Sequence, residues 1–122
     1  MSPTPFQLAL ASATVTALLG TGPTRFYPFG EAEEGVAKPY AVWQLVYGSP
    51  ANVLDQVPVE DAFGIQVDAY ALTGSEAAAV AKALRDAFEP HGYVTAYNGD
   101  CREADTRLYR SSFTVEFIQP RN

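Results

Sequence analysis

Cysteine and histidine are almost absent from this chain, which has one of each among 122 residues: Cys101 and His91. A single cysteine excludes an intrachain disulfide, and the two residues together cannot supply the usual Cys/His zinc sets. We interpret Cys101 as a small strand residue. His91 lies between Pro90 and Gly92, so we interpret it as a structural residue at a helix end. No metal ion or cofactor is expected.

Positive charge is also scarce, since 8 lysines and arginines stand against 14 acidic residues and give a formal net charge of −6. An acidic chain gains nothing from counterion release on phosphates, so sequence-independent binding to nucleic acid is not expected. No specific nucleic-acid binding is expected either. No basic helix for a membrane surface is present. Residues 1–24 carry no charge, but they are too interrupted to span a membrane and lack the basic start of a secretory signal. We expect a soluble protein made in the cytoplasm.

Motifs for catalysis are missing as well. The sequence has neither a glycine-rich phosphate loop nor a serine nucleophile elbow. Asp68 and Glu116 would form an acid–base pair only if their strands were neighbours, and we interpret Asp68 as a solvated or interface group. The acidic cluster Glu31, Glu33 and Glu34 lacks the spacing of a calcium loop, which favours a solvated loop. We therefore expect a protein that is not an enzyme.

The length suits a single domain over residues 1–122. Periodicity and turn residues predict two helices and five strands in the order α-β-β-β-α-β-β. The helices are expected at 5–19 and 75–88, and the strands at 25–28, 40–47, 63–71, 93–97 and 108–118. This order predicts an α+β fold, in which two helices pack on one face of a mainly antiparallel sheet.

Local signals support these boundaries. Thr4 and Thr73 each begin a capping box, the arrangement in which a threonine side chain caps a helix start. Lys82 and Asp86 have the spacing of an ion pair on one helix face. Asn98-Gly99 marks a turn or a bulge.

The strand at 40–47 is the most informative segment, because both of its faces are mostly apolar. Alternation assigns Ala41, Trp43, Leu45 and Tyr47 to one face, and Tyr40, Val42, Gln44 and Val46 to the other. Two short helices can cover one face of a small sheet, so the other face is expected to find a partner. A central strand buried within one ordinary domain is the alternative interpretation.

Interface candidates follow from the same strand and its surroundings. Tyrosine and tryptophan anchor protein interfaces as well as cores, which leaves both roles open for Trp43, Tyr47 and Tyr70. The connection at residues 48–58 contains Asp55 and is longer than a tight hairpin needs. We interpret it as a projecting arm, with Asp55 as a further contact candidate.

Several segments together resemble the tail terminator, or tail completion, family of long-tailed bacteriophages. They are the leading helix, Arg25-Phe26-Tyr27-Pro28, the strand entry Lys38 to Trp43, the strand Ile65 to Tyr70 with the helix after it, and the ending from Asp105 into Val115. The resemblance implies a structural protein of the virion tail, made in the host cytoplasm. It implies a ring, commonly hexameric, that caps the tail tube and stops its growth. The implied partners are further copies of the chain, the tail tube protein and a neck or head-completion protein. The family has no catalytic motif to carry over.

A ring implies a channel through which DNA passes. Acidic residues lining it would repel the phosphates, and the candidates are Glu31, Glu33, Glu34, Asp55, Glu60 and Asp61. Two other functions remain open: a neck or head-completion protein, and a small α+β enzyme or ligand-binding domain. The latter needs a pocket lined by some of Tyr27, Trp43, Tyr70 and Tyr97 with a polar group such as Asp68.

Overall fold

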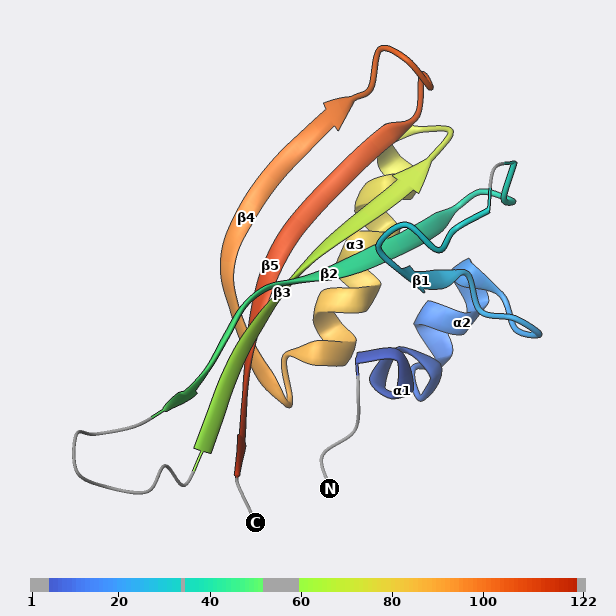
Figure 1. The fold of residues 1–122 in the computed structure, drawn as a ribbon. Helices are drawn as coiled ribbons and strands as arrows, with labels where there is room; N and C mark the ends of the chain where they lie inside the picture. The colour runs from blue at the N-terminus through green and yellow to red at the C-terminus, as the bar shows by residue number, and fades with distance from the viewer. Residues whose placement is uncertain (1–4, 34, 52–59, 121–122) are drawn as a thin grey trace.

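A computed structural model describes residues 5–33, 35–51 and 60–120 (Figure 1). Three helices and five strands follow one another, and the α+β fold is confirmed. Their bounds are α1 Pro5–Leu10, α2 Ala13–Leu19, β1 Phe26–Pro28, β2 Tyr40–Ala51, β3 Glu60–Ala71, α3 Gly74–Phe88, β4 Gly92–Arg102 and β5 Tyr109–Pro120. The strands form one sheet in the order β1-β2-β3-β5-β4, antiparallel except for the β1–β2 pair.

The single leading helix predicted at 5–19 is wrong, because the chain breaks into α1 and α2 at Ala11 and Ser12. Ser12 has an extended backbone, and its side chain accepts a hydrogen bond from the Val15 amide at 3.2 Å. It is thus the N-cap of a new helix rather than a polar residue within a longer one. The predicted cap Thr4 lies outside the described residues.

Helix α3 agrees with its sequence signals. The Thr73 hydroxyl accepts a hydrogen bond from the Glu76 amide at 3.2 Å, as the capping box predicts. Lys82 and Asp86 form the expected ion pair at 2.8 Å. Small residues such as Ala77 and Ala81 are buried on its inner side, which lets the helix lie close to the sheet.

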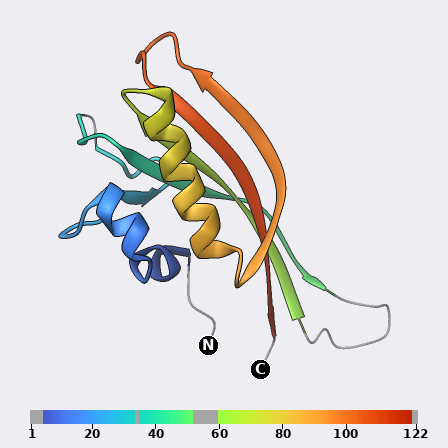
Figure 2. The same cartoon turned by 180° about the vertical axis from the view of Figure 1, so that it is seen from behind.

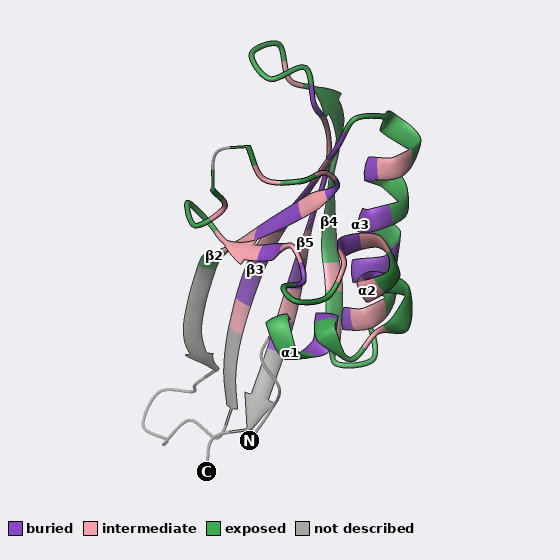
Figure 3. Ribbon diagram, turned by 90° about the vertical axis from the view of Figure 1, so that its right-hand side faces the viewer, coloured by how far each residue is buried: buried purple, intermediate pink, exposed green. Residues whose placement is uncertain are grey.

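All three helices lie on one side of the sheet, with α3 across β3 and β5 and with α1 and α2 beside it (Figures 2 and 3). The core lies between these layers. Its largest fully buried side chains include Phe26, Phe88 and Phe113. Phe88 contacts Phe113 with ring centroids 6.4 Å apart, which ties the end of α3 to the middle of β5. The opposite side of the sheet carries no helix among the described residues.

Several strands extend beyond their predicted bounds, β2 and β4 most of all. β2 continues through Gly48 and Pro50 to Ala51, because β3 pairs with it up to Glu60. Proline is tolerated on a strand whose outer edge is unpaired, and β2 has such an edge here. β4 continues past Asn98-Gly99, where the ladder shifts register, so the predicted bulge is confirmed. What remains of the predicted arm, residues 52–59 with Asp55, lies outside the described residues.

Candidate assembly surfaces

The side of the sheet without helices is the first candidate surface, and we call it the open face. Alternation along the paired strands assigns to it Tyr40, Val42, Gln44, Gln66, Asp68, Tyr70, Arg110, Ser112, Thr114 and Glu116. Unlike the helix-covered face, it mixes aromatic, charged and hydroxyl side chains. The two faces of the strand at 40–47 therefore differ, because β3 and β5 supply polar neighbours on this side. That a partner covers this face stays a prediction.

Two tyrosines dominate one end of the open face. Tyr40 and Tyr70 pair across β2 and β3, and their rings stack with centroids 5.1 Å apart. Burial raises the pKa of both phenols above the ordinary tyrosine value, and the carboxylate of Glu103 adds to the effect. The carboxylate of Asp68 raises the pKa of Tyr70 further. Both phenols therefore stay neutral over the physiological range.

Asp68 is buried rather than solvated, so of the two roles that the sequence allowed for it, only an interface role stays a prediction. Only 6% of it is exposed, although no helix covers this face. The Gln66 amide donates to its two carboxylate oxygens at 3.2 and 3.4 Å. Asp68 also pairs with Ser112 in β5, which holds it in the centre of the sheet. It is a partly satisfied buried carboxylate that shapes the open face.

Arg110 adjoins the same cluster. One of its terminal nitrogens lies 3.9 Å from a Glu103 carboxylate oxygen, and the other donates to the Cys101 sulfur at 3.4 Å. The contact with Cys101 is the largest of the effects that raise the pKa of Arg110. Cys101 is exposed and lies in β4, so the strand position predicted for it is confirmed.

The four predicted interface residues do not form one surface. Trp43 pairs with Val67 on the helix-covered face and packs against the core, whereas Tyr70 lies on the open face. The Trp43 indole nitrogen is buried without a hydrogen-bond partner among the described residues. Tyr47 pairs with Gly64, but the structure does not describe its side chain. Asp55 lies outside the described residues.

The predicted acidic group is also divided. Glu31 and Glu33 are exposed in the loop between β1 and β2, and Glu34 lies outside the described residues. Glu60 and Asp61 begin β3, where they pair with Ala51 and Pro50 at the far end of β2. The Glu31 amide donates to the Pro28 carbonyl, and Pro28 is level with Trp43, so the rest of β2 separates the two groups by roughly 25 Å. The loop between β1 and β2 and the far end of β2 lie toward opposite ends of the sheet (Figure 1).

The two outer edges of the sheet are a second candidate surface, one that the sequence did not reveal. β4 pairs only with β5, so its other edge is free along the described strand. β1 covers β2 only at 41–43, which frees the edge of β2 from Gln44 onward. Large apolar side chains are exposed along both edges: Leu45 at 61%, Val46 at 44%, Tyr93 at 67% and Tyr97 at 70%. In the sequence, only the weak alternation of apolar and polar residues at 93–97 indicated an exposed strand.

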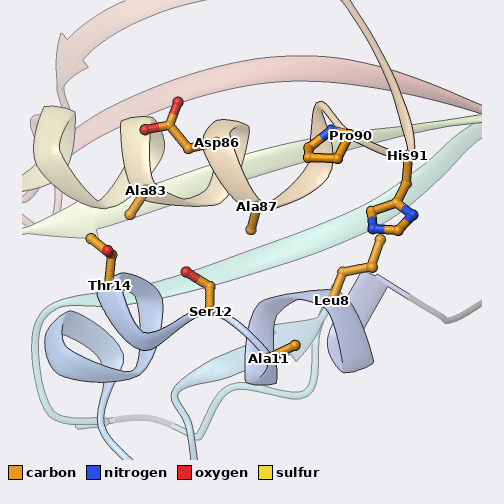
Figure 4. Close-up of a pocket in the computed structure, with 9 residues that line it drawn as sticks. All are labelled: Leu8, Ala11, Ser12, Thr14, Ala83, Asp86, Ala87, Pro90 and His91. Atoms are coloured by element: carbon orange, nitrogen blue, oxygen red, sulfur yellow. The ribbon is translucent and has the colours of Figure 1, made fainter.

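A shallow cavity of about 300 Å³ lies between the two N-terminal helices and α3 (Figure 4). It is lined by Leu8, Ala11, Ser12, Thr14, Ala83, Asp86, Ala87, Pro90 and His91. None of the aromatic residues predicted for a ligand pocket belongs to it. Tyr97 lines two other open cavities, of about 400 and 270 Å³, but neither of them includes Tyr27, Trp43, Tyr70 or Asp68. Trp43 and Tyr70 lie on opposite faces of the sheet, so they cannot line one cavity with each other. The geometry therefore does not favour the pocket hypothesis.

The described ranges also bear on metal binding and on membrane insertion. No group of three or more His, Cys, Asp or Glu side chains there is arranged to hold a metal ion. None of the helices that the structure describes is long and apolar enough to cross a membrane.

Comparison with known proteins agrees with this architecture. No curated protein matches the sequence. A chain from the solved structure "Virion of native gene transfer agent (GTA) particle" has a similar fold, with a TM-score of 0.65 and 17% identity over 96% of this chain and 92% of that one. The family described as "Tail completion protein gp17" matches residues 6–119. The chain therefore belongs to the gp17 family of tail completion proteins, which are structural components of phage tails.

Proposed function

We propose that this protein forms a ring of identical subunits that closes the end of the phage tail tube and so stops its polymerisation. The resemblance to tail terminators implies six subunits in the ring. The family match over residues 6–119 carries the proposal. Two features of the subunit support it. The sheet leaves one face without helices, and its two free edges differ from each other. Unlike edges suit head-to-tail contacts, which can close into a ring.

In this mechanism the ring has two different ends. One end binds the last ring of the tail tube protein. The other lacks a surface for a further tube subunit, so growth stops there, and it contacts a neck or head-completion protein instead. No bond is made or broken, and the protein acts through shape and contact area alone.

The experiment that tests this function is a count of tail lengths. Particles assembled without this protein should have tails of irregular, greater length, visible by negative-stain electron microscopy, and the added protein should restore a uniform length. Purified protein should bind isolated tails and not isolated heads. Tails of normal length without the protein, or binding to heads alone, would contradict the proposal and favour a head-completion role.

The divided acidic residues suggest a role at both mouths of the channel. Glu31 and Glu33 at one end, and Glu60 and Asp61 at the other, would repel DNA phosphates and keep the DNA from adhering. Neutralising all four with glutamine or asparagine should slow DNA release from otherwise normal particles. Unchanged ejection and infectivity would count against an acidic lumen while leaving the ring intact.

A further inference from the structure

Residues that pair with one another across successive strands lie at the same height along the strand direction, which we call a level. These levels show which residues of the two free edges lie at the same height. Leu45 in β2 pairs with Ile65, which pairs with Val115, which in turn pairs with Val94 in β4. The exposed stretch of β2 therefore lies level with the first half of β4, which forms the opposite edge of the same sheet. The second half of β4 is level with the part of β2 that β1 already covers.

Both outer strands have one extra residue at this place. The inner strands use three residues, 64–66 in β3 and 114–116 in β5. Over the same three levels β2 uses four residues, 44–47, and β4 uses four residues, 93–96. The extra residues are Val46 and Thr95, which lack a partner in the ladder. A bulge normally disfavours pairing of an edge strand with a strand of another molecule. Here the two edges match each other in length, four residues against four, so that joining them places Gln44 opposite Ala96 and Tyr47 opposite Tyr93.

Strand direction agrees with this match. Each step from β2 through β3 and β5 to β4 is antiparallel, so β4 runs opposite to β2. Rotation about an axis parallel to the strands preserves their direction. A copy placed by such a rotation would bring its β2 antiparallel to β4 of its neighbour, with no change of level.

We propose that neighbouring subunits join edge to edge, with residues 93–96 of one copy pairing antiparallel with residues 44–47 of the next, so that the sheets continue around the ring. This inference rests on the proposed ring and names its contact. The joint satisfies the free backbone groups of both edges. It also covers Leu45, Val46 and Tyr93, which are exposed in the single subunit. Pro50 lacks an amide hydrogen and limits how far the pairing extends along β2.

The test is disulfide cross-linking between subunits, because residues opposite each other in an antiparallel pair lie within disulfide distance. The natural thiol is first removed with Cys101→Ser, since Cys101 is the only cysteine. Gln44→Cys and Ala96→Cys, which lie opposite each other in the proposed pairing, are then combined in one chain. Mild oxidation of the ring, alone or bound to tail tubes, should deplete the monomer band and produce a ladder up to the ring size on a non-reducing gel. Added reductant should restore the monomer.

Control variants separate the outcomes. Each single cysteine should leave the monomer band unchanged, and so should Gln44→Cys with Arg102→Cys, because Arg102 lies at the other end of β4. Rings seen by negative stain without a ladder would overturn the joint but not the proposed function. Dimers from Gln44→Cys or Ala96→Cys alone would show that like edges pair, and they would also overturn the proposed joint. Absence of any ring, in solution and on tubes, would overturn the proposed function and the joint with it.

Discussion

Phe113 and Ser112 are neighbours in β5, yet they point to opposite faces of the sheet and meet different surroundings. Phe113 is fully buried against Phe88. Ser112 is also buried, at 7% exposure, but its hydroxyl accepts a hydrogen bond from the Asn98 amide. The covered face thus buries mainly apolar side chains, with Ser111 bonded to Asp100 as an exception, whereas the open face buries polar groups that hydrogen-bond to one another. The two faces therefore stabilise the fold by different interactions.

The covered face should respond most strongly to mutation. Phe113→Ala removes a fully buried ring between α3 and the sheet, so we expect the free energy of unfolding to fall by about 3–5 kcal/mol. Chemical denaturation monitored by circular dichroism would measure this loss. Phe29→Ala is the matched control, because Phe29 is exposed in a loop. Equal losses for the two variants would erase the distinction between core and surface.

The open face should respond less. Tyr70→Ala removes a half-buried ring that stacks on Tyr40, so we expect a loss of about 1–2 kcal/mol in the same measurement. Tyr70→Phe keeps the ring and should stay close to the original stability. A loss from Tyr70→Ala as large as that from Phe113→Ala would mean that the open face is also part of the core.

The sequence predicted the covered face better than the open one. The Thr73 capping box and the apolar spacing of α3 are local signals, and both survive in the fold. The end of β2 was missed because Gly48 and Pro50 resemble a turn locally, while its pairing with β3 is set by residues far along the chain.

The candidate sites were harder to predict for the same reason. Alternation placed Trp43 on one face of its strand, but only the position of the helices decides that this face is the covered one. The acidic residues form one group in the sequence-based hypothesis, and the sheet then separates Glu31 from Glu60. Free edges depend on strand order, and strand order is not a local property of any segment.

The two stacked tyrosines give the open face a dependence on alkaline pH. Their folded pKa values are raised, chiefly by burial, so their contribution to stability is complete below the ordinary tyrosine pKa of about 10. It is lost as the pH rises through the higher folded values. An ultraviolet absorbance titration should therefore show late-ionising phenols, and Tyr70→Phe should remove one of them. Simultaneous ionisation of all tyrosines at the ordinary value would contradict this expectation.

The smallest effect should come from the outer surface of α3. Lys82 and Asp86 form an ion pair with side chains 69% and 60% exposed. Such pairs contribute little in water, so Lys82→Ala should lower the free energy of unfolding by about 0.3–0.5 kcal/mol. The loss should shrink at high salt, and a denaturation series over salt concentration would detect that. A salt-independent loss would point to packing by the lysine stem instead.

Val46 and Thr95 also constrain how this chain can change length during evolution. A bulge residue is spare within its own subunit, so losing Val46 alone leaves every remaining pair of β2 and β3 in place. If the joint between subunits exists, the same deletion leaves three residues in β2 opposite four residues in β4 of the neighbour. The two edges then no longer match in length. Loss of Thr95 as well would restore the match. Relatives of this chain should therefore keep both residues or lose both, although the two positions never touch within one molecule.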